Sequence, residues 1–537
     1  MTVPAQPAGG SAGPPPGPAG LAGTRGLIAG RLWRRTFLRA AAVPLIVLAP
    51  LIALAPTADS RFNIYMHGGL FRDNPLLMVP HTLHTIPSYL ALGNFRPLGR
   101  LVEKSFDLAT YTLTGLTGLP ANVSFRLFEF AAAVVLTLVA VLFAESVVTR
   151  GRLFAGAPST VAALTPFAVG TGFVAAGANS PAVLFGGLYL TSAAIVLGTA
   201  ALACRGLNTE RRVGWPLGLL VVLAGAALAS FNEITYFALP LATVAVAARG
   251  LGVLGLGWRS LLTGRAARLL VLLWAGFLPV FATIRVIIYL YCSTRTCYRG
   301  SDITLNAESV VTMGVRTVAW LPPVMWSAAV HGTGRPWLTG VVPLLALVLL
   351  AVLAVRTVRD LPRLTPVGPR AATGLAAAAF ALLILGGALG GLNSDVQLNV
   401  QRGLWGMGWR DTALTACAGS LLLVAAVHAA LRGPRTRKWG LLVVTVLLVL
   451  AATASTAANK RYRDHVGPTT ASLIANQVAQ EMAEFDRTAA GNLRRCGLRQ
   501  RFQDLYPNLA FSQKRFTESL DLAAEQLAGV PFCEESP

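Results

Sequence analysis

The chain has 537 residues, of which 54% are hydrophobic and only 13% carry a charged side chain. This composition excludes a soluble globular protein, because too few polar groups remain to cover the surface of a chain of this length. The formal net charge is +22, but the arginines lie mainly in short connections between apolar runs, where they set orientation in a membrane. We therefore expect membrane lipids as partners and no nucleic acid.

Repeated apolar runs predict an all-α, polytopic transmembrane bundle, because a backbone in lipid must satisfy its hydrogen bonds within each segment. Residues 1–30, rich in Pro, Gly and Ala, predict a disordered cytoplasmic tail. A transmembrane domain over 31–456 follows this tail. Its apolar runs predict about eleven spans, at 38–56, 127–148, 157–175, 181–203, 214–230, 232–248, 268–291, 339–355, 371–391, 412–431 and 439–456.

Charges in alternate connections predict the side of the membrane that each connection faces. The arginine groups that mark cytoplasmic connections lie around Arg150, Arg211, Arg265, Arg363 and Arg435. The other connections, 57–126, 292–338 and 392–411, then face outward. We expect a multi-pass protein of the plasma membrane with a cytoplasmic N-terminus and an extracytoplasmic C-terminus.

The segment 310–330 is apolar enough to suggest a further span. It carries Arg316 and the pair Pro322-Pro323, and counting it would place the connection around Arg363 on the outer side. We therefore interpret it as a re-entrant or interfacial helix.

The cysteines give an independent indication of topology, since stable disulfides need an oxidising compartment. We expect the bonds Cys292–Cys297, in an outer loop, and Cys496–Cys533, in the outer tail. The two remaining cysteines fall at or inside spans, where a small buried thiol is the simpler interpretation.

Residues 457–537 predict a small helical, disulfide-stapled extracytoplasmic domain. Apolar side chains recur at helical spacing from Leu473 to Phe485 and again from Phe516 to Leu527. This tail contains no cluster of acid, histidine and nucleophile, which favours a lid or a module that docks a protein partner.

The first outer segment, 57–126, is long and rich in polar and aromatic residues. It contains the stretches Ala58-Asp59-Ser60-Arg61-Phe62-Asn63, Leu70-Phe71-Arg72-Asp73-Asn74-Pro75 and Gly93-Asn94-Phe95-Arg96-Pro97-Leu98-Gly99-Arg100. Here the chain resembles, over roughly residues 30–300 and in architecture more than in a motif, the GT-C superfamily of polyprenyl-phosphate-dependent membrane glycosyltransferases. The resemblance implies two helices lying along the membrane and an acid after the first span that acts on the acceptor. Many members have two adjacent acids there, whereas Asp59 stands alone and Asp73 follows later.

A transferase of this kind must deprotonate an acceptor hydroxyl and stabilise a leaving phosphate, so it needs a carboxylate near cationic groups at the membrane interface. The candidate catalytic acids are Asp59, Asp73 and Glu233. Their structural alternatives are an interfacial acid or helix cap for Asp59, a turn for Asp73 and a helix cap for Glu233. The candidate substrate-binding residues are Arg96, Arg100, Arg285, Arg402, Trp409 and Arg410.

The substrate-binding candidates also have structural alternatives. Arg96 and Arg100 fit an amphipathic interfacial helix, and the tryptophan fits a membrane anchor. Arg285 could extend to the interface or pair with Glu233. His81 and His84 share a helix face but lack a third ligand nearby, so no metal site is predicted, and whether a divalent metal takes part stays open.

Three functions compete. The first is transfer of a sugar from a polyprenyl-phosphate donor to a cell-envelope glycan or lipid acceptor on the outer face. The second is a transporter or flippase of lipid-linked or envelope precursors, with Glu233 and Arg285 along its path. The third is a non-catalytic envelope assembly protein that binds a protein partner through 457–537.

Overall fold

The chain folds as a bundle of helices. The computed structural model describes residues 19–534 except 209–212, 296, 299–302, 323, 325–339 and 432. Within these ranges the regular structure is helical, apart from two isolated backbone bridges. The arginine group around Arg211 and most of the second outer segment after Leu321 fall outside the described residues.

Eight helical segments are long and apolar enough to cross a membrane, so the protein is a multi-pass membrane protein. They match eight of the predicted spans. They are α6 (Ala121–Val148), α8 (Gly186–Gly206), α10 (Ala238–Ala248) with its flanking turns Glu233–Phe237 and Arg249–Val253, α12 (Arg265–Thr294), α15 (Val341–Asp360), α16 (Pro369–Gly391), α18 (Thr412–Ala430) and α19 (Pro434–Val466).

The other three predicted spans, 38–56, 157–175 and 214–230, coincide with helices that differ from ordinary spans. Helix α1 (Ala19–Leu48) carries four arginines in its middle, α7 (Thr160–Gly170) extends for only about 16 Å, and α9 (Trp215–Phe231) has 17 residues. The number eleven therefore stays a prediction. Since α1 is already helical at Ala19, the expected disordered tail would end there, and its residues 1–18 lie outside the described residues.

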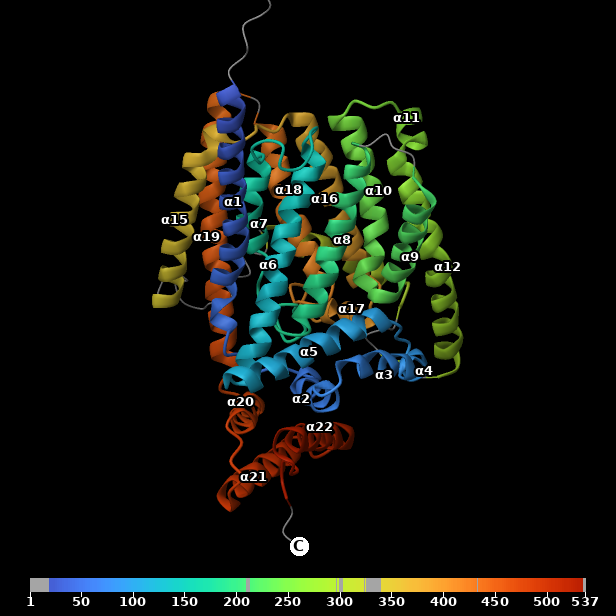
Figure 1. The fold of residues 1–537 in the computed structure, drawn as a ribbon, viewed down its shortest axis with the longest axis vertical. Coiled ribbons are helices and arrows are strands. Elements are labelled where there is room, and N and C mark those ends of the chain that lie inside the picture. Colours follow the sequence, from blue (N-terminus) through green and yellow to red (C-terminus); the bar gives the residue numbers. More distant parts are fainter. Residues whose placement is uncertain are drawn as a thin grey trace, which may run out of the picture.

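The long first segment after α1 forms helices that cross one end of the bundle (Figure 1). They are α2 (Ser60–Phe71), α3 (Met78–His84), α4 (Ile86–Ala91) and α5 (Pro97–Thr117). Pro97 begins α5 in the first helical position, where its missing N–H costs nothing, and Gly118 ends it with φ of +71°. We refer to these four helices, α2 to α5, as the platform.

The tail helices α20 (Thr470–Ala483), α21 (Ala489–Leu505) and α22 (Ala510–Ala528) lie beyond this platform (Figure 1). Their apolar side chains share one core with the platform, since Ile474, Phe502 and Phe516 cluster with Phe62 and Tyr65. Helix α22 packs along α2. The tail is therefore continuous with the first outer segment through its core.

Both predicted disulfides are confirmed. Cys292–Cys297 closes a short loop after α12, and Cys496–Cys533 ties α21 to the end of the chain. The two other cysteines are buried free thiols, as expected.

The described part of 310–330 contains a short helix that packs one face against the bundle. Helix α13 (Ala307–Ala319) has 13 residues, about 20 Å, against a hydrocarbon thickness of about 30 Å. It packs on α16, and its Arg316 side chain, 1% exposed, is bonded by both oxygens of Asp411 at 2.6 and 2.9 Å. The helix is not among the eight that are long enough to cross a membrane, and the re-entrant or interfacial position stays a prediction. Pro323 and 325–330 lie outside the described residues.

At the opposite end of the bundle, α1 and α15 are joined by a buried ion pair. The Asp360 carboxylate accepts hydrogen bonds from Arg35 at 2.6 Å and from Arg39 at 2.5 Å. The side chains of Arg39 and Asp360 are only 3% and 2% exposed. Removing one partner would leave a buried charge without its counter-ion.

We predict that Asp360→Asn lowers the free energy of unfolding by about 3–5 kcal/mol, because Arg39 stays buried and charged. The matched control is Asp464→Asn, whose exposed pair with Lys460 should contribute only about 0–1 kcal/mol. Thermal unfolding of both variants in detergent measures the difference. Equal melting temperatures for the two variants would contradict the prediction.

Candidate functional site

A pocket of about 670 Å³ opens where the bundle, the platform and the tail meet. Such a volume suits a small-molecule or lipid-headgroup site. Its polar and charged lining residues come from widely separated parts of the chain. They are Asp59, Tyr89, Asn94, Arg96, Arg100, Asn179, Tyr189, Tyr298, Asp395, Trp409, Arg410 and Arg515.

Five of the nine predicted catalytic and substrate-binding residues line this pocket. They come from three places in the sequence and are Asp59, Arg96, Arg100, Trp409 and Arg410. The other four, which are Asp73, Glu233, Arg285 and Arg402, do not line it.

Arg96 is the most unusual of the pocket residues. It immediately precedes α5 and is 5% exposed, yet its Nε and Nη1 atoms have no hydrogen-bond partner among the described residues. Burial alone would lower the pKa of Arg96, but Tyr189, Glu233 and Glu103 outweigh burial and raise it. A charged guanidinium with two unpaired N–H groups, in a residue that lines a pocket, is suited to an anionic ligand.

Arg100 lies one helical turn further along α5. Its Nη1 donates to Glu103 Oε2 at 2.9 Å, and its guanidinium lies 4.3 Å from the centre of the Tyr89 ring. Glu103 is 5% exposed, and although burial opposes ionisation, Arg100 and Arg96 lower its pKa. An ionised Glu103 therefore holds Arg100 at the pocket wall.

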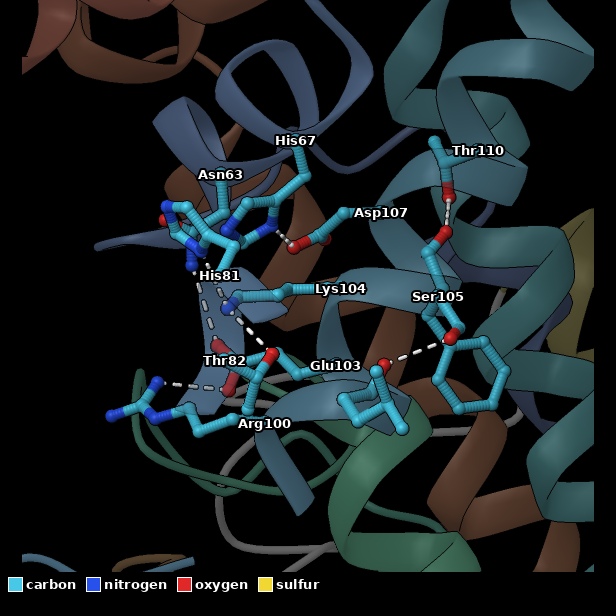
Figure 2. Close-up of polar contacts among 12 residues, drawn as sticks. Asn63, His67, His81, Thr82, Arg100, Glu103, Lys104, Ser105, Asp107 and Thr110 are labelled. Atoms are coloured by element: carbon cyan, nitrogen blue, oxygen red, sulfur yellow. Dashed lines mark hydrogen bonds and ion pairs between the residues drawn. The ribbon is translucent and has the colours of Figure 1, made fainter. Parts of the chain in front are cut away.

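Asn63 connects this wall to the tail, and Figure 2 shows its contact with Glu103. Its Nδ2 donates to Glu103 Oε1 at 3.3 Å, and its Oδ1 accepts a hydrogen bond from Arg515 of α22. Arg515 also lies 3.7 Å from Asp59, the residue before α2. A buried Asn–Glu pair thus fixes two pocket arginines from different parts of the chain, Arg100 and Arg515.

Glu233 lies beside the pocket and not in its lining. Its side chain is 15% exposed and lies 3.7 Å from Arg410 Nη1, while the Arg410 guanidinium lies 5.0 Å from the centre of the Trp409 ring. Arg285 is held over the rings of Tyr236 and Phe281. The ion-pair partner of Glu233 is thus Arg410, and the expected alternative of a Glu233–Arg285 pair is not formed.

Two predicted residues, Asp73 and Arg402, lie outside the pocket lining. Asp73 Oδ1 accepts a hydrogen bond from Gln526 Nε2 of the tail at 3.0 Å, so it contributes to tail docking. Arg402 is an exposed residue at the end of the short helix α17 (Ser394–Gln401).

Sequence reasoning missed several lining residues. Asp395 stands in the first turn of α17, and Phe511 and Arg515 come from the tail helix α22. Asp395 is an acid in a short outer segment, just after a predicted span, and this position could have indicated it as a lining residue. No sequence signal indicates that α22 packs against α2, because this contact joins segments that are more than 400 residues apart in the chain and depends on the tertiary fold.

A second polar cluster fixes the platform internally (Figure 2). The Lys104 ammonium donates to Thr82 Oγ1 at 2.8 Å and lies 3.0 Å from His81 Nδ1, and His67 Nδ1 lies 2.7 Å from Asp107 Oδ2. Contact with an ammonium group does not suit a metal ligand. Among the described residues, no group of three or more His, Cys, Asp or Glu side chains could hold a metal ion.

Lys104 gives this cluster a pH dependence. It is 3% exposed, and burial, followed by the nearby Arg100, lowers its pKa from 10.5 to about 8. Between these two values the unfolded chain holds the proton and the folded chain does not, so the free energy of unfolding rises with pH, by up to about 3 kcal/mol.

We predict that the wild-type protein gains stability relative to Lys104→Met when the pH is raised from 8 to 10.5. The variant lacks the titrating ammonium and therefore lacks this increment. Thermal unfolding of both proteins at the two pH values measures it. A constant difference in melting temperature would show that the Lys104 pKa is not lowered by folding.

Comparison of the chain with family models, curated proteins and solved structures finds no match. The geometry of the pocket therefore carries the functional argument.

Proposed function

We propose that the protein is a membrane glycosyltransferase of the GT-C type, which transfers a sugar from a polyprenyl-phosphate donor to a cell-envelope acceptor on the outer face. The observation that supports this best is the buried guanidinium of Arg96, a residue that lines the pocket and whose Nε and Nη1 atoms have no partner among the described residues. A lipid phosphate at the membrane interface supplies the charge and acceptor oxygens that such a group needs.

The orientation is part of the proposal. Arginine-rich connections face the cytoplasm, and the platform, the pocket and the tail face outward. The two disulfides support this assignment, since both lie at the platform end of the bundle and stable disulfides need an oxidising compartment. In this scheme all eleven apolar helical segments belong to the membrane domain of a plasma-membrane protein.

In the proposed reaction, Asp59 accepts the proton of the acceptor hydroxyl. The hydroxyl oxygen forms a bond to the anomeric carbon of the sugar, and the bond between that carbon and the phosphate oxygen breaks. Polyprenyl phosphate leaves with the electron pair, and Arg96 and Arg410 stabilise its charge. Trp409 offers a ring against which the sugar can stack, and the tail residue Arg515 keeps Asp59 beside the pocket.

Glu233 acts indirectly in this scheme. Its carboxylate, close to Arg410 and within the electrostatic reach of Arg96, keeps two guanidiniums together in the absence of a ligand. A phosphate that enters the pocket then meets prearranged donors, which is the condition for strong electrostatic stabilisation.

We predict that Arg96→Gln weakens binding of polyprenyl phosphate at least tenfold, because the phosphate loses its buried charged donor. The matched control is Arg402→Gln, an exposed arginine outside the pocket on the same side. Binding to the purified full chain in detergent can be followed by native mass spectrometry. Wild-type affinity in Arg96→Gln would contradict the proposed phosphate site.

We predict that Asp59→Asn retains this binding but lowers the rate of sugar transfer by about 10²–10⁴-fold, the contribution of a positioned general base. The matched control is Asp73→Asn, an acid of the same segment that lies outside the pocket lining and bonds Gln526. Transfer is measured with labelled polyprenyl-phosphate sugars and an envelope fraction as acceptor. Wild-type transfer by Asp59→Asn would exclude it as the base.

A further inference from the structure

A second cavity of about 670 Å³ lies at the end of the bundle opposite to the platform. Its walls are three connections: the one between α6 and α7, the turn after α10, and the one between α15 and α16. These connections lie far from α2, α5 and the tail (Figure 1). The cavity is therefore separate from the candidate site.

The charge that lines this cavity is mainly positive. Three arginines contribute to the lining, Arg150, Arg152 and Arg370, against one acid, Glu145. Glu145 is 4% exposed, and its Oε2 accepts the Ser159 backbone N–H at 3.0 Å, so it is already engaged in the fold.

Two of the three lining arginines are not used to hold the walls together, and the third, Arg150, joins two walls by a single bond. Among the described residues, the side chains of Arg152 and Arg370 have no hydrogen-bond or ion-pair partner, and only Nε of Arg150 is bonded, to Val253 O at 2.9 Å. Three guanidiniums gathered around one cavity repel one another unless an anion lies between them.

Other residues fix the shape of the cavity. Arg249, which is not in the lining, donates to Thr149 O at 3.0 and 3.1 Å, and Arg437 donates to Val367 O at 3.0 Å. The backbone of Thr365 exchanges two hydrogen bonds of 3.0 Å with the chain at 158–160. These bonds fix the walls of the cavity, and the exposed side chains of Arg152 and Arg370 remain free to bind a ligand.

We propose that this cavity binds a phosphate-bearing ligand. A phosphate group carries a charge between one and two and several acceptor oxygens, which match the planar donors of guanidinium groups. Val148, Phe154 and Leu251 add an apolar part to the wall, which suits the glycerol and first acyl carbons of an anionic lipid. A lipid headgroup and a small phosphate compound share this chemistry, and the experiment separates them.

The test is native mass spectrometry of the purified full chain in detergent, titrated with dioctanoyl phosphatidic acid or with glycerol 3-phosphate. We expect the double substitution Arg152→Gln with Arg370→Gln to weaken binding at least tenfold. The matched control, Arg259→Gln with Arg363→Gln, removes two exposed arginines of the same end that lie outside the cavity and should keep wild-type affinity. Arg96→Gln should also leave this binding unchanged, so a failure of the outer phosphate site is recognised separately.

Binding of phosphatidic acid alone would identify a lipid headgroup, and equal binding of glycerol 3-phosphate would identify a small phosphate compound. Both outcomes support the site if only the cavity variant loses them. The proposal is overturned if neither ligand binds the wild-type chain, if the cavity variant keeps wild-type affinity, or if the control variant loses as much.

Discussion

The cost of burying arginine is the constraint on which much of this structure depends. A guanidinium at the edge of hydrocarbon needs partners, and most of the buried ones have them: Arg39 has Asp360, Arg126 has Glu129, and Arg316 has Asp411. These pairs join segments or fix the ends of helices. Among the described residues, Arg96 alone leaves two guanidinium nitrogens buried and unbonded. Arg96 lines a pocket, so we expect a bound ligand to supply the hydrogen-bond partners that its two nitrogens lack.

The tail and the platform belong to the same argument. Their shared core brings α22 onto α2, and Arg515 then reaches both Asp59 and Asn63. Asn63 in turn is bonded to Glu103, the partner of Arg100. The packing of apolar side chains some distance from the pocket thus determines where its charged groups lie. Because the tail contributes residues to the pocket lining, it is a part of the site itself and more than the lid that the sequence suggested.

Hydropathy predicts the long helices well, because a continuous apolar run has few alternatives in a membrane. It does not distinguish α7, whose 11 residues are buried on every side inside protein, from a full span, since both are simply apolar. In the pocket, Asp59 and Arg410 were predictable because each lies next to a predicted span on the same side, and Arg96 because it lies with Arg100 in the long outer segment. Arg515 was not predictable, because its position depends on how α22 packs. The cysteine pairs were predictable from topology alone, as each pair falls in one outer segment.

The central claim is that the pocket beside Arg96 holds a lipid phosphate. The most direct measurement is a structure of the full chain in nanodiscs that contain polyprenyl phosphate. We expect density for a phosphate within hydrogen-bond distance of Arg96 Nε and Nη1, with the prenyl chain leaving the pocket toward the membrane. A well-resolved pocket that holds only water, with polyprenyl phosphate bound elsewhere on the bundle, would contradict the claim.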